Sequence, residues 1–361
     1  MQISFAKSVL FLPIAALSLG SLAVAGDSVD TTPGTPRYVV LPAKPGTSAV
    51  KPATVLPTWN GSFVYNGTTY NYNMVGTAPS SNTSTTVPVF LIPVKIVITA
   101  SGGGTTTFDP SHVLSNGKTV IQNTVASPIF DSTSTYVQGG VNVGTTQYID
   151  AFQRANFWGT VSTNPNYHVL LGGPTVVPEV TLKPSSRYGK TGKPFGFTAG
   201  EVNINYFDAA AQKIISKITA IQPNALPIFL TNNVYLTDFG CCIGGYHSAV
   251  GAQAYAHATY VDVPGQFAQD VSALSHEVGE FVDDPLVNIP NGNPVACGIL
   301  EVGDPLENNP NFGAYPYTVN GFQYNLQDLV TLPYFGAPPS TSVNNWSTFQ
   351  GEVLAVCQNG G

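Results

Sequence analysis

Basic residues are absent from the C-terminal part of this chain. All 13 Lys and Arg residues lie at or before Lys217, whereas the 144 residues that follow contain 12 Asp and Glu residues. Those carboxylates must be solvated, hydrogen-bonded, paired with the N-terminal half or bound to a cation. Seven of the 12 fall between Glu277 and Glu307, and this clustering calls for a specific explanation.

The first 25 residues have the pattern of a secretion signal. Lys7 supplies a positive charge, the apolar run from Val9 to Val24 is too short to span a bilayer, and Ala23-Val24-Ala25 matches a signal-peptidase site. We therefore expect residues 1–25 to be a signal peptide and the mature protein to be secreted, in an extracellular, periplasmic or wall-associated location. No later stretch predicts a membrane span. The net charge of −7 argues against nucleic acid and anionic membranes as partners.

The cysteine content also indicates an oxidising compartment. The four cysteines form an even set, which favours two disulfides, and they lack the C-x-x-C spacing of a thiolate metal site. A bond between the neighbours Cys241 and Cys242 would be strained. We therefore expect each of them to pair with Cys297 or Cys357.

The order of hydrophobic patterns predicts an α+β fold with an N-terminal β-rich portion. Residues 26–57 are rich in Pro, Thr and Lys and predict an extended linker or arm, and residues 58–361 predict a single domain. Asn66-Gly67 predicts a hairpin turn within 62–70, and Pro88 and Pro93 make the run 87–99 an edge or bulged strand. Further expected elements are helices at 146–158 and 265–284 and a third helix whose N-cap is Asp208, together with strands at 227–236 and 254–261. The chain after 284 is expected to be rich in loops.

The helix expected at 265–284 carries the residues with the most chemistry. Its apolar residues form one stripe, and His276 and Glu280 lie one turn apart on the opposite side. This spacing matches the His-Glu-x-x-His zinc helix, with a carboxylate in place of the second imidazole. Glu277 would then be placed to deprotonate a metal-bound water. The alternative is a solvated polar face, against which Gly279 argues mildly because Gly in a helix interior suggests a packing reason.

A third metal ligand is expected downstream, since catalytic zinc sites use three protein ligands and leave one position open. Glu301 and Asp304 are both candidates, although Asp304-Pro305 is also typical of a turn or cap. His247 is a further candidate, either as a ligand or as a donor to a developing oxyanion. His257 either orients a ligand or is a core histidine.

Calcium is the alternative cation. Hard oxygen donors suited to Ca²⁺ are abundant here, although nothing matches an EF-hand loop; they are Asp283, Asp284, Glu301, Asp304 and Glu307. A secreted protein with a structural calcium ion therefore competes with the zinc interpretation.

Three segments in order resemble the motifs of the EXORDIUM-like, phosphate-induced family of plant extracellular proteins and of related secreted bacterial proteins. They are Cys241-Cys242-Ile243-Gly244-Gly245-Tyr246-His247, Ser275-His276-Glu277-Val278-Gly279-Glu280 and Glu301-Val302-Gly303-Asp304. The resemblance covers roughly 238–357 and implies an extracellular location and a zincin-like mixed sheet with an active-site helix, the site lying within 238–310. It marks His247, His276, Glu277, Glu280, Glu301 and Asp304. The position of Cys297 and the Asp283-Asp284-Pro285 sequence depart from the plant pattern.

These observations predict a secreted zinc-dependent hydrolase of the metallopeptidase type. His276 and Glu280 would hold zinc together with Asp304 or Glu301, Glu277 would be the general base and His247 would line the cleft. The substrate would be a peptide or polysaccharide outside the cell. The competing hypothesis is a non-catalytic carbohydrate-binding module of the cell wall or extracellular space, in which the same acids hold a structural calcium or zinc ion.

Overall fold

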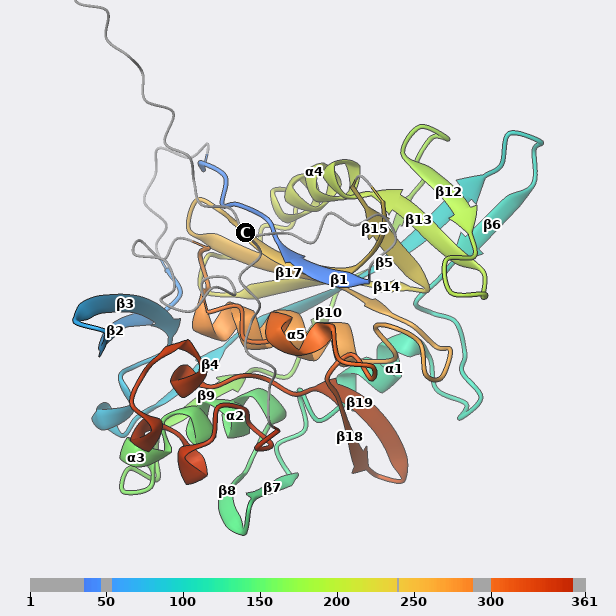
Figure 1. The fold of residues 1–361 in the computed structure, drawn as a ribbon. Helices are drawn as coiled ribbons and strands as arrows, with labels where there is room; N and C mark the ends of the chain where they lie inside the picture. Colours follow the sequence, from blue (N-terminus) through green and yellow to red (C-terminus); the bar gives the residue numbers. More distant parts are fainter. Residues whose placement is uncertain (1–35, 47–53, 239, 288–299, 353–361) are drawn as a thin grey trace, which may run out of the picture.

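The computed structural model describes residues 36–46, 54–238, 240–287 and 300–352 (Figure 1). Within these ranges the protein has a mixed α+β fold in which strands predominate. None of the described helices is long and apolar enough to cross a membrane. The expected signal peptide, Cys297 and Cys357 lie outside the described residues.

A large mixed sheet forms the centre of the molecule. Its strands run in the spatial order β10-β5-β14-β17-β16-β15-β13-β12, with β1 added to β16 and with β6 and β11 added to β5. The strands of this sheet are β1 (Arg37–Val40), β5 (Val89–Thr99), β6 (Thr105–Phe108), β10 (Thr175–Val176), β11 (Val180–Leu182), β12 (Gly189–Gly192), β13 (Ala199–Asn203), β14 (Leu226–Asn232), β15 (Val234–Thr237), β16 (Cys241–Val250) and β17 (Gln253–Tyr260).

The two faces of this sheet bury separate hydrophobic cores. Helix α4 (Ile204–Ile215) covers one face, where Phe207 packs among residues such as Ile92 and Tyr246. Helix α5 (Ser272–Asp283) lies against the opposite face (Figure 1). Because side chains alternate along a strand, β16 directs Tyr246 towards α4 and its neighbour His247 towards α5.

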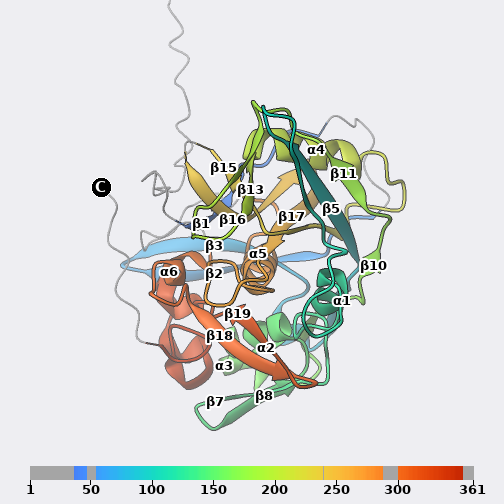
Figure 2. The same ribbon diagram turned by 90° about the vertical axis from the view of Figure 1, so that its right-hand side faces the viewer.

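Smaller elements pack on the far side of α5 (Figure 2). They are the helices α1 (Val120–Val125), α2 (Tyr148–Asn156), α3 (Trp158–Val161) and α6 (Asp304–Glu307), the hairpins β2–β3 (Thr58–Tyr65, Thr68–Val75), β7–β8 (Thr135–Gln138, Val141–Thr145) and β18–β19 (Ala314–Val319, Phe322–Gln327), and the parallel pair β4–β9 (Ser84–Val87, His168–Leu171). Short 3-10 helices lie at Pro79–Ser81, Leu332–Phe335, Pro339–Thr341 and Val343–Asn345. Helix α5 is therefore a central helix, enclosed by the sheet on one side and by these elements on the other.

Several expected elements are present. The hairpin β2–β3 turns at Asn66 and Gly67, both with positive φ, as a two-residue turn of this sequence requires. The helix expected at 146–158 corresponds to α2 and α3, the strand expected at 227–236 to β14 and β15, and the strand expected at 254–261 to β17.

Three local expectations are wrong. The run 87–99 is not an edge strand, because β5 is paired on both sides. Pro93 lies where the partners of β5 change from β14 and β10 to β11 and β6, so the missing N–H of Pro93 is tolerated. Helix α4 is capped by Asn203, whose side chain accepts from the Tyr206 N–H, and Asp208 lies buried inside it. The helix expected at 265–284 begins only at Ser272, as α5, because Ala268 and Asp270 have positive φ and cannot belong to a right-handed helix.

The expected cysteine pairing is also wrong. Cys241 is joined by a disulfide to its neighbour Cys242. The peptide bond between them is cis, and their Cα atoms lie 3.1 Å apart.

Part of the expected linker belongs to the sheet. Residues 37–40 form β1, which pairs in parallel with β16 so that Val40 lies opposite His247. Tyr38 is buried in the core on the α5 side, and Lys44 forms an ion pair with the buried Asp208 of α4. Residues 37–44 therefore contact both faces of the sheet, close to His247 and α5.

Candidate metal centre

Helix α5 presents the expected apolar and polar faces, but neither faces solvent. Leu274, Val278 and Phe281 pack in the core, and His276 and Glu280 project from the opposite side. All twelve residues of the helix are buried. A buried polar face requires partners, because desolvated charges are costly unless they are compensated.

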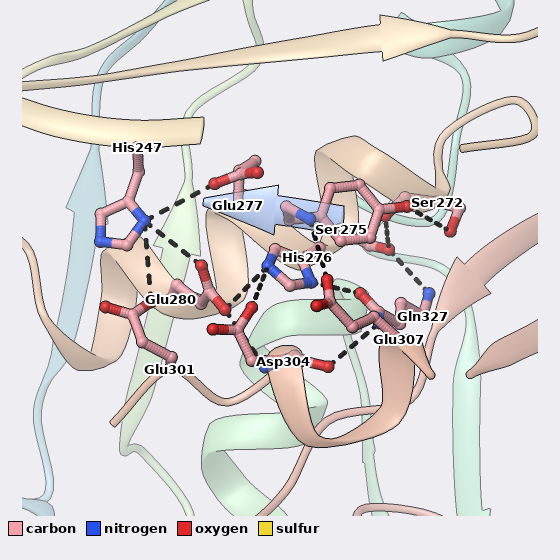
Figure 3. A network of polar contacts seen from close by, with 12 residues as sticks. His247, Ser272, Ser275, His276, Glu277, Glu280, Glu301, Asp304, Glu307 and Gln327 are labelled. Atoms are coloured by element: carbon pink, nitrogen blue, oxygen red, sulfur yellow. Dashed lines mark hydrogen bonds and ion pairs between the residues drawn. The ribbon is translucent and has the colours of Figure 1, made fainter. Parts of the chain in front are cut away.

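Six side chains from three segments meet on this polar face (Figure 3). We call them the His–carboxylate cluster: His247 from β16, His276, Glu277 and Glu280 from α5, Glu301 from the segment before α6, and Asp304 from the start of α6. Five of the six are buried, and only the side chain of Asp304 is partly exposed, at 27%. All six residues marked by the sequence are therefore brought together.

Glu280 lies between the two histidines (Figure 3). Its Oε1 is 2.8 Å from His276 Nε2, and its Oε2 is 3.3 Å from His247 Nδ1. Asp304 Oδ1 lies 3.4 Å from the same His276 Nε2. The donor atoms of His276, Glu280 and Asp304 lie within 4.8 Å of one another, a spacing at which they could hold a metal ion.

A second group forms around His247. Its Nδ1 lies 3.6 Å from Glu277 Oε2 and 4.0 Å from Glu301 Oε2, in addition to the contact with Glu280. His247, Glu277 and Glu280 likewise place donor atoms within 4.8 Å of one another. Neither ring nitrogen of His247 and neither carboxylate oxygen of Glu277 makes a hydrogen bond, although both side chains are buried.

The orientation of the His276 ring is fixed by Gln327 of β19. Gln327 donates through Nε2 to the Gly303 carbonyl, which leaves its Oε1 to accept from His276 Nδ1 at 2.5 Å. His276 Nδ1 therefore carries the proton, and Nε2 faces Glu280 and Asp304. A hydrogen bond of this kind on the far nitrogen is typical of metal-binding histidines, because it sets the tautomer and ring orientation.

Two glycines make room for these side chains. A Cβ on Gly245 would lie 2.5 Å from Glu277 Oε1, and a Cβ on Gly303 would lie 2.2 Å from His276 Nδ1. Tyr38 closes the other side of His276, with its ring centroid 4.0 Å from the imidazole and its N–H donated to Glu307. The close approaches thus depend on the absence of side chains at 245 and 303.

In the metal-free cluster, protons on the histidines and on Glu277 offset the negative charge of the carboxylates. Burial opposes the charged form of His276, but the charge of Glu280 and the contact with Asp304 raise its pKa well above the ordinary value. Burial likewise opposes charge on His247, yet Glu277 and Glu280 raise its pKa to about 10. Burial raises the pKa of Glu277 to about 8, despite the attraction of the two imidazoles.

The remaining acids respond to the same surroundings. Burial raises the pKa of Glu301 well above its usual range, and repulsion from Glu280 and Asp304 adds to the shift. Burial would also raise the pKa of Glu280, but its position between His276 and His247 lowers it below the ordinary value. Glu280 is therefore ionised in the metal-free cluster.

Other residues considered from the sequence have separate roles. Asp283 accepts a hydrogen bond from Gln153 of α2, and Glu307 accepts one from the backbone of Tyr38. His257 is a core histidine on the α4 side of the sheet, where its Nε2 contacts Thr231 Oγ1 at 3.1 Å and burial lowers its pKa to about 3. Gly279 has a packing reason, because a Cβ there would lie 2.7 Å from Leu329 Cδ1.

Sequence reasoning did not find Gln327, Tyr38 or Gly303. Gln327 contacts His276 across 51 residues, and Tyr38 lies in a Pro-rich arm with no pattern that indicates a site. Gly303 stands directly before Asp304, and the glycine itself was the only sign in the sequence that a side chain approaches the backbone closely there.

No protein-family model, no curated protein and no solved structure matches this chain.

Proposed function

We propose that this protein is a secreted zinc-dependent hydrolase of the metallopeptidase type, in which His276, Glu280 and Asp304 hold the ion. The observation that carries the proposal is His276 Nε2. This nitrogen is buried, lies on the side of the ring opposite the Gln327 hydrogen bond, and faces two carboxylate oxygens, Glu280 Oε1 at 2.8 Å and Asp304 Oδ1 at 3.4 Å. One imidazole and two carboxylates form a donor set that zinc accepts, with a fourth position left for water.

The unsatisfied atoms of the cluster fit a bound cation. Buried polar atoms without hydrogen bonds cost free energy, about 1–3 kcal/mol each and more for charged groups. Here they include His247 Nε2 and Glu277 Oε1. A divalent cation would compensate several of these groups together.

Glu277 supports catalysis in addition to binding. It neighbours His276 on α5 and is buried, and its pKa of about 8 allows it to accept and return a proton near neutral pH. A bound zinc ion would supply a Lewis acid and lower the pKa of a coordinated water towards neutrality. His247 faces Glu277 and Glu280, and in its charged form it would donate to a developing oxyanion.

Two features of the fold support the proposal of a zincin-like arrangement. The helix that bears the His-Glu-x-x-Glu residues lies against a mixed sheet, and His247 comes from β16, an antiparallel neighbour of β17. The N-terminal sequence supports export, and the disulfide between Cys241 and Cys242 is compatible with an oxidising compartment.

A specific observation favours the competing function, an extracellular carbohydrate-binding module with a structural zinc or calcium ion. Five of the six cluster side chains are buried, as the ligands of a structural ion are. The hairpin β2–β3 also carries stacked rings, Phe63 on Tyr70, and an exposed Tyr65, which are suited to sugar stacking.

Activity measurements separate the two functions. Zinc-loaded wild-type protein and the variant Glu277→Gln are compared for hydrolysis of fluorescently labelled casein, with His112→Gln, an exposed histidine outside the cluster, as the control. We expect Glu277→Gln to lose about 10²–10⁴-fold in rate, the usual contribution of a general acid–base group, and His112→Gln to be unchanged. Equal rates in wild type and Glu277→Gln would eliminate Glu277 as the base. A zinc-loaded wild type that is inactive but binds insoluble polysaccharide would favour the binding module.

A further inference from the structure

The two oxygens of Glu280 face different imidazoles. Oε1 faces His276, and Oε2 faces His247. One ion bound by His276, Glu280 and Asp304 leaves Oε2 and His247 unused. A carboxylate whose two oxygens point to two separate nitrogen donors has the arrangement of a ligand that bridges two ions.

The surroundings of His247 form a second set of donors. Its side chain is 1% exposed, and neither of its ring nitrogens makes a hydrogen bond. Glu277 is fully buried, both of its oxygens lack hydrogen-bond partners, and its Oε2 faces His247 Nδ1. Buried polar groups are normally satisfied, and because His247 Nε2 and Glu277 Oε1 have neither a hydrogen bond nor an ion pair within the described residues, these two side chains call for a further partner.

The spacing of these donors suits an ion. Two donor atoms on a tetrahedral zinc ion, each about 2.0–2.2 Å from it, lie about 3.3–3.6 Å apart. His247 Nδ1 lies 3.3 Å from Glu280 Oε2 and 3.6 Å from Glu277 Oε2. The second set therefore needs little rearrangement to enclose a cation.

Charge balance points the same way. A divalent ion requires its histidine ligands to be neutral and its carboxylate ligands to be ionised. The three carboxylates that would be ligands, Glu277, Glu280 and Asp304, would then carry a charge of −3. One divalent ion would leave −1 on this buried set, and two would leave +1, which Glu301 beside His247 would offset in its ionised form.

We propose that the His–carboxylate cluster binds two divalent cations bridged by Glu280. The first is the ion held by His276, Glu280 and Asp304, and the second is held by His247, Glu277 and Glu280. The proposal rests on the proposed function for the first ion and extends it. It changes the role of Glu277, which becomes a metal ligand instead of the group that accepts a proton.

The test counts the metal ions that the full-length protein binds. Protein stripped with a chelator is dialysed against zinc, and zinc and protein are measured by inductively coupled plasma mass spectrometry. We expect two zinc ions per chain in wild type and in the control His112→Gln, and one in His247→Gln and in Glu277→Gln. Circular dichroism establishes that each variant is folded. As a second measurement that needs no variant, Mn²⁺-loaded wild type is expected to show the electron paramagnetic resonance spectrum of a spin-coupled pair.

The outcomes separate this proposal from the one on which it rests. One zinc per chain, lost in His276→Gln but kept in His247→Gln, would overturn the second ion and leave the hydrolase proposal intact. Two zinc ions in Glu277→Gln together with the spectrum of isolated Mn²⁺ ions would also overturn it. Wild type that binds no zinc and no Mn²⁺ would remove both proposals.

Discussion

Zinc binding to the metal-free protein should release protons, so its affinity should rise with pH. The reason lies in His276, whose Nε2 must offer a lone pair to the ion. Burial opposes charge on this ring, but Glu280 and Asp304 raise its pKa well above the ordinary value of 6.5. At neutral pH the ring of the metal-free protein therefore holds a proton that zinc must displace.

The size of the effect follows from the number of protons displaced. Each proton released changes the binding constant about tenfold per pH unit, which corresponds to about 1.4 kcal/mol. Release from His276 alone gives about a 100-fold increase in affinity between pH 6 and pH 8. A second ion would displace one proton from His247, whose pKa is about 10, and one from Glu277, whose pKa is about 8, so the uptake of two ions gains about another 10⁴-fold over the same interval.

Isothermal titration calorimetry provides the assay. Zinc is titrated into chelator-treated protein at pH 6, 7 and 8 in buffers with different ionisation enthalpies, so that the proton count is obtained beside the affinity. The variant His112→Gln is the control, because this exposed ring lies outside the cluster. An affinity that is constant from pH 6 to pH 8, with no proton released, would refute the reasoning.

Three further predictions concern the stability of the cluster. Because its pKa is raised, the charged form of His247 stabilises the metal-free fold fully below pH 6.5, and this contribution is lost as the pH rises from 6.5 to 10. We therefore expect the melting temperature of chelator-treated protein to fall across this range and that of zinc-loaded protein to fall less. Gly303→Ala should weaken zinc binding at least tenfold and destabilise the fold by about 1–3 kcal/mol, because the new Cβ would lie 2.2 Å from His276 Nδ1; Gly173→Ala, whose Cβ meets nothing within 4 Å, is the matched control, and equal zinc affinity in the two variants would contradict the packing argument. Tyr38→Ala should lower the free energy of unfolding by about 3–5 kcal/mol in chemical denaturation, as for other buried aromatic side chains, whereas Tyr188→Ala, at a more exposed position, should change it far less. A loss in Tyr38→Ala as small as that in Tyr188→Ala would show that β1 is not part of the core.

Local features of the fold were predictable from the sequence. The turn at Asn66-Gly67 depends on two residues that accept positive φ, and the polar face of α5 depends only on helical spacing. The partners of β5 were not predictable, because Pro93 is typical of an edge strand and only the change of pairing partners along β5 explains its presence inside the sheet. Burial of the polar face of α5 also depends on segments distant in the sequence that pack over it.

The candidate site likewise contains residues that the sequence predicted and residues that it did not. His276, Glu277 and Glu280 follow from a spacing within one helix, and the acid-rich segment that follows indicated Glu301 and Asp304. Gln327 and Tyr38 act through contacts across 51 residues and through pairing of β1 with β16, for which no local pattern exists. The disulfide expectation failed because it excluded a bond between neighbouring cysteines as strained, whereas Cys241 and Cys242 are joined.

Anomalous diffraction at the zinc absorption edge tests the central claim most directly. Crystals of the full-length protein grown with zinc should show an anomalous peak enclosed by His276 Nε2, Glu280 Oε1 and Asp304 Oδ1, and crystals of Glu280→Gln should lack it. A wild-type crystal with zinc at other residues only, or with no peak at the cluster, would contradict the account.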